Sequence, residues 1–149
     1  NQCKTTLVTP KLQQSIIFSS QEDSAIVLKE IGESKFFQKI VFPQKNLPEL
    51  VTMKKMNTDS VSNIAGYPCN AIQLVFSDET VYDVLFTTAI TPTIPYFEMA
   101  FKDIPGLVLS YSITTKKGVS IRYNASNVDL SPITLNQFEF NKNEYQIID

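Results

Sequence analysis

The residue types that most often carry chemistry are scarce in this sequence of 149 residues, which contains no histidine. Histidine is the commonest general base and metal ligand near neutral pH. Its absence excludes a Ser-His-Asp triad, a Cys-His dyad and any zinc site with a histidine ligand. Two cysteines, Cys3 and Cys69, cannot complete a four-ligand structural zinc site. We therefore expect no catalytic residue, no metal site and no cofactor, and we do not expect an enzyme.

Three carboxylates lie close together at Asp78, Glu79 and Asp83. A pair of acids flanking a cleft is the arrangement that glycoside hydrolysis would require of a chain without histidine. Asp78 and Glu79 instead fall in a short polar turn, and Asp83 alternates with the apolar residues Tyr82 and Val84, so it faces away from them. We interpret the three as turn acids and one solvent-facing acid.

The overall composition indicates a folded protein with no affinity for nucleic acid. Hydrophobic residues make up 43% and charged residues 19%, which is typical of a globular chain. The net charge is −2, and the single arginine is Arg122, so the clustered positive charge that nucleic acid requires is missing. The length predicts one domain over residues 1–149. No apolar run approaches the roughly 20 residues of a membrane span, so we expect no transmembrane segment.

The two cysteines leave two alternatives open. They could form a disulfide, which persists in the oxidising compartments that exported proteins reach. Alternatively they are independent thiols, with Cys69 a small buried residue. The chain begins at Asn1 and not at methionine, which fits a mature protein from which an export signal has been removed.

Short runs rich in β-branched and aromatic residues, separated by turn-like residues, predict a largely β chain. A helix over residues 25–38 is the alternative for two of these runs. The runs alternate in polarity and follow one another through short turns, so consecutive hairpins and antiparallel pairing are expected. The predicted strands cover residues 16–19, 25–31, 36–42, 50–56, 71–76, 80–86, 107–113, 119–123, 134–140 and 145–148.

The segment 91–106 is the one long irregular stretch. Residues 96–102 (YFEMAFK) could make about two helical turns after Pro95. This concentrates aromatic side chains in a connection between strands. The candidate ligand-binding residues are Tyr96, Phe97, Met99 and Phe101. They form either a plug that closes one end of a curved sheet or the wall of an apolar cavity.

Four segments, in this order, resemble motifs of the GLPGLI-type and related domain-of-unknown-function envelope proteins. They are AGYPC (65–69), VYDVLFTTAI (81–90), FKDIPGLVLSY (101–111) and ITLNQFEFNKNEYQI (133–147). The resemblance covers residues 60–148 and is that of a divergent relative. Asp103 and Ile104 replace the family's Gly-Leu before Pro105, Leu85 and Phe86 replace its Trp-Tyr pair, and Asn141 stands where the tail proline is usual.

The resemblance implies a periplasmic or outer-membrane-associated, exported protein whose distant kin are the lipoprotein carriers. It also implies a strongly curved antiparallel sheet, a half-barrel of nine or ten strands, with one or two short helices covering the concave face. The expected function is non-catalytic binding of a hydrophobic ligand, such as a lipid or acyl chain, in that concavity. The alternative is a structural or protein-interaction module of the cell envelope that binds another protein and no small molecule.

Overall fold

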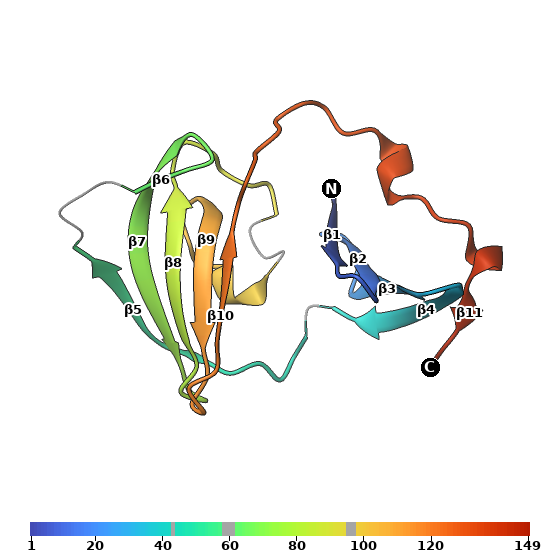
Figure 1. The fold of residues 1–149 in the computed structure, drawn as a ribbon, viewed down its shortest axis with the longest axis horizontal. Coiled ribbons are helices and arrows are strands. Elements are labelled where there is room, and N and C mark those ends of the chain that lie inside the picture. Colours follow the sequence, from blue (N-terminus) through green and yellow to red (C-terminus); the bar gives the residue numbers. More distant parts are fainter. Residues whose placement is uncertain (43, 58–61, 95–97) are drawn as a thin grey trace. The chain divides into compact units, whose positions relative to one another are not determined.

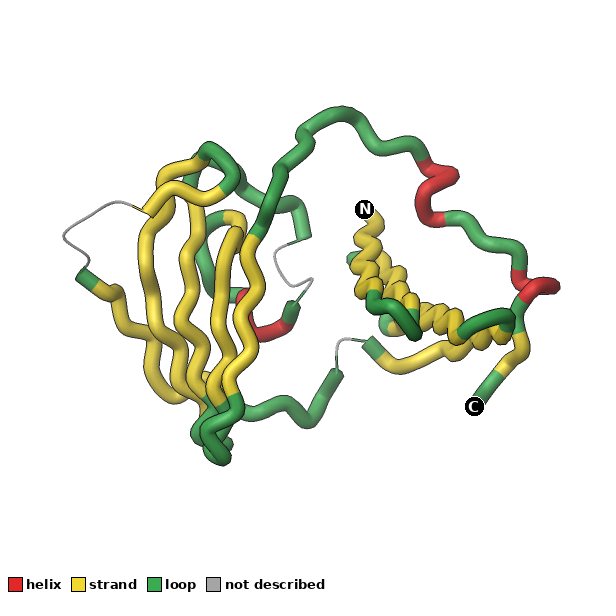
Figure 2. Tube along the Cα trace, in the orientation of Figure 1, coloured by secondary structure: helices red, strands yellow, loops and turns green. Residues whose placement is uncertain are grey.

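Two separate sheets make up the structure, a computed structural model that describes residues 1–42, 44–57, 62–94 and 98–149. The chain divides into two compact units. Unit 1 contains Asn1–Lys45 and Ser131–Asp149, and unit 2 contains Asn46–Leu130. Figure 1 labels the strands of each unit, and Figure 2 shows that nearly all regular structure in both is strand.

Unit 1 contains a five-stranded sheet in the order β1-β2-β3-β4-β11. The first four strands follow one another as antiparallel hairpins, whereas the last strand comes from the other end of the chain and pairs parallel to β4. Gly32, with a φ of +59°, makes the two-residue turn between β3 and β4 possible. The strands are β1 (Gln2–Val8), β2 (Gln13–Ser19), β3 (Ser24–Ile31), β4 (Ser34–Val41) and β11 (Gln146–Ile147).

Unit 2 contains a six-stranded sheet whose path is β10-β9-β8-β7-β5, with β6 paired to β7. All its pairs are antiparallel. Ala65 and Gly66, both at positive φ, form the turn between β6 and β7. The strands are β5 (Leu50–Met56), β6 (Ser62–Ile64), β7 (Tyr67–Phe76), β8 (Val81–Thr87), β9 (Leu107–Thr114) and β10 (Ser120–Asn124).

The core of unit 2 forms between one face of this sheet and the segment that joins β8 to β9. That segment carries the short 3₁₀ helix η2 (Met99–Phe101), and its Phe101 and Ile104 pack onto the sheet. Gly106 allows the segment to return close to the sheet, because any Cβ there would collide with the backbone carbonyl of Thr87. The buried core residues are Ile72, Leu74, Val84, Phe86, Phe101, Ile104 and Val108.

The predicted fold class is confirmed: the chain is mainly β, its sheets are antiparallel apart from the β4–β11 pair, and neither sheet closes on itself. The strands are divided between two sheets, whereas the sequence predicted one. The chain passes between the units twice, in the loop before β5, which contains Pro48 with no N–H to donate to a ladder, and in the connection after β10. That the whole chain behaves as one domain stays a prediction.

Three local predictions differ from the structure. The predicted strand 134–140 is replaced by the 3₁₀ helix η3 (Leu135–Phe138), which is followed by a second one, η4 (Lys142–Glu144). The side chain of Asn141 accepts a hydrogen bond from the N–H of Asn143, and this local bond favours a turn over a ladder. The alternative helix over 25–38 is wrong, and the strands β1 and β6 were not predicted.

Candidate functional site

Two of the four predicted ligand-binding residues, Met99 and Phe101, lie in the part of the chain that the structure describes. Tyr96 and Phe97 lie outside the described residues. Met99 is half-buried, and Phe101 is 1% exposed at the centre of the core of unit 2. Of the predicted helix over 96–102, the described part contains one 3₁₀ turn, η2. Phe101 therefore fills space against the sheet instead of facing a cavity.

Phe101 belongs to a continuous row of aromatic rings that crosses the sheet of unit 2, which we call the aromatic row. Its ring lies edge-on to Tyr82 of β8 at 5.9 Å and to Tyr111 of β9 at 4.9 Å between centroids. Tyr111 stacks on Tyr123 of β10 at 4.8 Å, and Tyr82 contacts Phe76 of β7 at 5.4 Å. The row thus links four neighbouring strands through the segment that covers them.

The strand register explains why these rings meet. Tyr111 lies directly opposite Tyr123 in the β9–β10 pair and opposite Val84 in the β8–β9 pair. Tyr82 is two residues from Val84, so its side chain is on the same face as Tyr111. Opposite and diagonal neighbours on one face of a sheet are within reach of aromatic side chains.

A carboxylate lies beside the buried end of the row. Glu98 precedes η2, and burial raises the pKa of its side chain, although the backbone N–H of Ala100 partly offsets this by donating a hydrogen bond. Burial raises the pKa of Tyr111 to about 12, and the charge of Glu98 adds to that rise. The pKa of Tyr82 is raised for the same two reasons, burial first. These phenols remain protonated at neutral pH.

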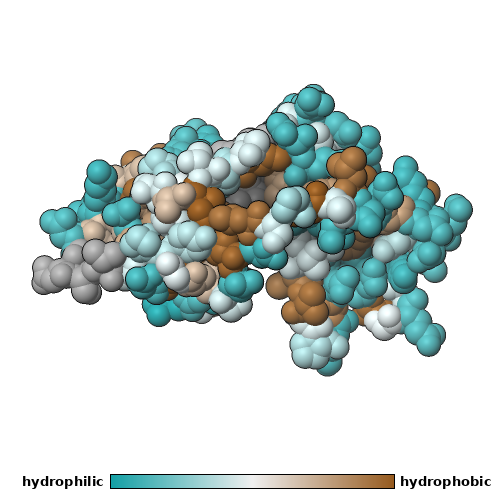
Figure 3. Space-filling model, turned by 90° about the horizontal axis from the view of Figure 1, so that it is seen from above, coloured by the Kyte–Doolittle hydropathy of each residue, from teal (hydrophilic) through white to brown (hydrophobic). Residues whose placement is uncertain are grey.

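The other end of the row reaches solvent at the edge strand β10. All five residues of β10 are exposed, and Tyr123, at the end of the row, is 41% exposed. Ile121 is 50% exposed and Val119 56%, and both lie on the same face as Tyr123. Apolar side chains also reach the surface elsewhere on both units (Figure 3). Exposed apolar side chains also lie on the edge strands β1 and β5, for example Val8 at 68% and Val51 at 65%. The edge at β10 differs from these two because the aromatic row ends there.

The backbone of β10 offers hydrogen-bonding groups at this edge. Thr115 N donates to Val119 O at one end of the β9–β10 pair, and Ala125 N donates to Leu109 O at the other. Bonding alternates along an antiparallel pair, so Ile121 and Tyr123 bond to β9. The N–H and C=O groups of Ser120, Arg122 and Asn124 then point away from β9, where a further strand would lie.

The opposite face of the sheet carries polar side chains that bond across neighbouring strands. Gln73 Nε2 donates to Asp83 Oδ1 at 2.8 Å across β7 and β8, which confirms that Asp83 faces away from the core. Ser110 Oγ donates to Asn124 Oδ1 at 2.6 Å across β9 and β10. Ser110 and Ser112 on this face are buried, at 6% and 9% exposure. Apolar side chains share the face with Asp83, namely Val75, Val81 and Leu85, so its surface is mixed.

The acids and cysteines singled out from the sequence have structural roles. Asp78 accepts a hydrogen bond from the N–H of Thr80 in the β7–β8 turn, and Glu79 pairs with Lys116 at the surface. Cys3 and Cys69 are both free thiols, so the disulfide alternative does not hold in this structure. Cys69 is buried, and burial raises the pKa of its thiol, which donates to Tyr67 O.

A small hollow of about 220 Å³ lies beside Cys69, at the ends of β7 and β8. Threonine, asparagine and backbone groups line it together with Pro68 and Ala89.

Among the described residues, no group of three or more His, Cys, Asp or Glu side chains could hold a metal ion. The described helices are also too short to cross a membrane.

The sequence pointed to the segment 96–102 but missed the strand residues that complete the row, Tyr82, Tyr111 and Tyr123. A usable signal was present, since each is a tyrosine on the apolar face of an alternating strand. Only the register shows that they touch.

The chain matches no family model, no curated protein and no solved structure. The resemblance to GLPGLI-type proteins therefore stays a prediction.

Proposed function

We propose that this chain is a non-catalytic protein-binding module in which β10 takes up an extended segment of a partner protein. Adding a strand to an exposed sheet edge is a recurrent mode of peptide recognition. The observation that carries the proposal is the coincidence, on β10, of outward-pointing backbone groups with the exposed end of the aromatic row. Backbone bonds would supply affinity, and contacts with the row would supply selectivity.

The other described edge of this sheet is less suited to the same role. Lysine side chains and register irregularities are common devices that prevent an edge from pairing. β5 has both, since Lys54 and Lys55 are adjacent and its register with β7 shifts between Leu50 and Thr52. The β9–β10 register is regular over all five residues of β10, and β10 contains no lysine.

The chemistry of the occupant follows from the side chains next to the edge. A strand added beside β10 would place every second side chain beside Ile121 and Tyr123 on the apolar face. An aromatic or branched aliphatic residue at those positions would continue the aromatic row and cover surface that is now exposed. The partner segment is thus an extended peptide with apolar residues at alternate positions.

Lipid binding in the concavity is the competing function. It would require the space against Leu74 and Val84 that Phe101 and Ile104 now occupy. The periplasmic or outer-membrane-associated location stays a prediction and is compatible with either function. Native mass spectrometry of protein taken from a membrane extract tests the lipid function directly. Stoichiometric co-purified lipid would favour it over the protein-binding function.

The protein-binding function is tested by selecting binders to the full chain from a displayed library of random linear peptides. We expect the selected peptides to have apolar residues at every second position. Arg122→Pro removes one outward N–H and introduces a ring at the edge while leaving the β9 pairing intact. It should weaken binding of these peptides by about tenfold or more.

The matched control is Lys55→Pro in β5. Phe76 N donates to Thr80 O, so by alternation Gln73 and Ala71 bond to β5, and the N–H of Lys55 points away from β7. This variant places the same ring at the opposite edge and should leave peptide binding unchanged. Equal loss of binding in both variants, or none in either, would contradict the assignment to β10.

A further inference from the structure

The sheet of unit 1 is completed by Ser131–Asp149, which we call the C-terminal segment. Its strand β11 pairs with β4 through two residues only, with Gln146 opposite Phe36 and Ile147 opposite Phe37. One further backbone bond runs from Ile148 N to Phe37 O. The rest of β4, from Gln38 to Val41, has no partner on that side among the described strands.

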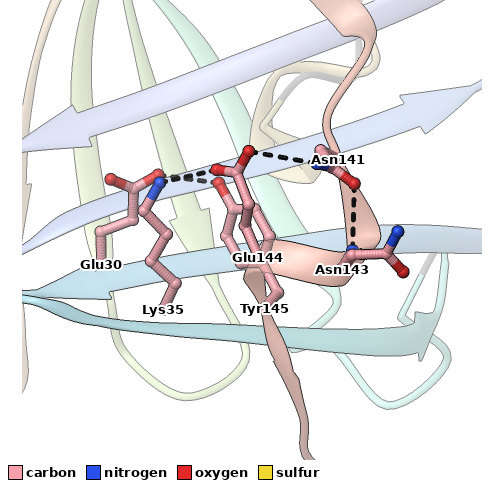
Figure 4. Close-up of polar contacts among 6 residues, drawn as sticks. All are labelled: Glu30, Lys35, Asn141, Asn143, Glu144 and Tyr145. Carbon is pink, nitrogen blue, oxygen red and sulfur yellow. Dashed lines mark hydrogen bonds and ion pairs between the residues drawn. The ribbon is translucent and has the colours of Figure 1, made fainter.

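A group of polar contacts, which we call the clasp, holds this segment against β3 and β4 (Figure 4). Lys35 Nζ and Glu144 Oε2 form an ion pair at 3.1 Å. Tyr145 donates its hydroxyl hydrogen to Glu30 Oε1 at 2.8 Å. Asn141 Nδ2 donates to the other carboxylate oxygen of Glu144 at 3.2 Å and so fixes its orientation.

The clasp surrounds a small aromatic contact. Phe140 stacks on Phe37 at 5.7 Å between centroids and lies edge-on to Tyr145 at 5.8 Å. The ammonium group of Lys142 lies 5.5 Å from the centroid of the Phe37 ring, and that of Lys35 lies 5.6 Å from the Tyr145 ring. At the opposite edge of the sheet, Lys4 of β1 donates to the backbone carbonyl of Gln137.

None of the residues of the C-terminal segment is buried. Three of its aliphatic side chains, Ile133, Leu135 and Ile147, are 70%, 75% and 76% exposed. Phe138, Phe140 and Tyr145 are half-buried. The segment is therefore attached to unit 1 by contacts that remain largely exposed to solvent.

The connection that leads into the segment imposes few constraints on where it docks. Residues 126–134 contain no helix or strand (Figure 2), and nine extended residues can span about 30 Å. Lys35 and Glu30 on the sheet, and their partners Glu144 and Tyr145 on the segment, belong to the same chain. A second copy of the chain therefore offers this segment the same docking surface. Exchange of identical elements between copies creates a dimer at low cost, because it preserves every contact.

We infer that residues 131–149 exchange between two copies of this chain, so that each C-terminal segment completes the unit 1 sheet of its partner. The partner is a second copy because the docking surface matches this segment in charge, in aromatic contact and in strand register. The resulting dimer retains the β4–β11 pair and the clasp, both now formed between copies. This inference is independent of the proposed function, which uses a different edge in unit 2.

The test uses two full-length charge-reversal variants, Lys35→Glu and Glu144→Lys. Each alone places like charges in its own clasp. When the two variants are mixed and exchange segments, each segment meets a docking surface of opposite charge, and both ion pairs are restored. We expect heterodimers to exceed homodimers by about threefold over random pairing, as measured by native mass spectrometry with one variant isotopically labelled.

The matched control is the double variant with both substitutions, whose clasp is restored within one chain. Mixed with the unsubstituted chain, it should show no preference for heterodimers, because both cross-docked clasps would then contain like charges. Random pairing in the first mixture would overturn the inference. So would a preference of equal size in the control mixture.

A shortened connection gives a second test that does not depend on a weak ion pair. Deleting residues 127–130 shortens the connection by about 13 Å and so reduces how far the segment can reach from the end of β10. We expect a several-fold increase in the dimer fraction by light scattering. A deletion variant that remains monomeric at every concentration would overturn the inference. A dimer that is lost on Arg122→Pro, but not on charge reversal of the clasp, would instead place the contact at β10.

Discussion

The two units of this chain cover their sheets with segments of very different origin. In unit 2 the covering segment is local, since it joins β8 directly to β9 and brings Phe101 and Ile104 onto the sheet. In unit 1 the C-terminal segment arrives after the whole of unit 2 has intervened in the sequence. Unit 2 is therefore continuous in sequence, and unit 1 is not.

This difference has a physical consequence for the two units. The local segment of unit 2 joins two neighbouring strands, β8 and β9, and places Phe101, 1% exposed, in the core. The C-terminal segment of unit 1 closes a much longer loop and contributes no buried residue. We conclude that unit 2 owes its stability to a packed core, whereas the last strand of unit 1 is held by surface contacts.

Deleting residues 131–149 should have the largest effect and should act on one unit only. It removes β11, the clasp and the aromatic contact with Phe37, so the amides of β4 around Phe36 and Phe37 should lose protection from hydrogen exchange. Unit 2 should keep its protection, because none of its core residues lies in the deleted segment. Equal loss of protection in both units would show that they unfold together as one domain.

Replacing one aromatic residue in each unit compares the core with the surface contact directly. Phe101→Ala should lower the free energy of unfolding of unit 2 by about 3–5 kcal/mol, since it leaves a cavity in a closed core. Phe140→Ala should cost unit 1 about 1 kcal/mol, because Phe140 is only half-buried and its loss is mainly that of ring contacts. Denaturant titration with unit-specific hydrogen exchange measures both. Similar losses of unfolding free energy in the two variants would contradict the conclusion that unit 2 depends on a packed core and the C-terminal segment on surface contacts.

Raising the pH should destabilise both units through different tyrosines. Burial is the main cause that raises the pKa of Tyr111 and of Tyr145 to about 12, from an ordinary value of 10. Each folded unit thus binds its phenolic proton more tightly than the unfolded chain does. The resulting stability is full below pH 10 and is lost as the pH rises to 12.

The phenylalanine variants separate these two contributions. Tyr111→Phe should flatten the alkaline loss of melting temperature in unit 2 alone, and Tyr145→Phe should flatten it in unit 1 alone. Tyr145→Phe also removes the hydrogen bond to Glu30, so unit 1 should be slightly less stable at neutral pH. Thermal unfolding followed by residue-resolved spectroscopy between pH 8 and pH 12 measures both effects. If neither variant changed the loss of melting temperature at alkaline pH, deprotonation of Tyr111 and Tyr145 would not be its cause.

Glu98→Gln should have the smallest effect and should stabilise unit 2. Burial raises the pKa of Glu98, so the folded state disfavours its charged form, and stability is lost as the pH rises through that pKa. The amide removes the charge, and the melting temperature at pH 7 should rise slightly. The difference should vanish below pH 4, where Glu98 is protonated in both states. A lower melting temperature at pH 7 would mean that the carboxylate makes a stabilising contact.

Most of the secondary structure could be predicted from local patterns. The strands β3, β5, β7, β8, β9 and β10 follow runs of alternating apolar residues, and the turns at Ser77-Asp78-Glu79 and Gly118 carry the expected residue types. β1 was missed because QCKTTLV lacks a clear apolar face, and its exposed pattern agrees with that. Residues 134–140 have the pattern of a strand in the sequence. In the structure the Asn141 side chain accepts a hydrogen bond from the N–H of Asn143, and this local bond favours the turn that follows η3.

The candidate site was only half predictable. An aromatic cluster in the segment 96–102 could be read from the sequence, and burial of Phe101 agrees with a plug. The contacts of Phe101 with Tyr82 and Tyr111 depend on strand register, which pairs residues far apart in the sequence. The choice between β5 and β10 as a free edge also requires the order of strands.

Residue types and their periodicity predict a mainly β chain with antiparallel hairpins, and the composition lacks histidine for general-base chemistry. These properties depend on residue type and on periodicity over a few neighbouring positions. Tertiary structure alone decided that the strands form two sheets, that Tyr123 ends an aromatic row at an open edge, and that the C-terminal segment completes unit 1. Each of these depends on pairing between distant residues, which no local pattern in the sequence records.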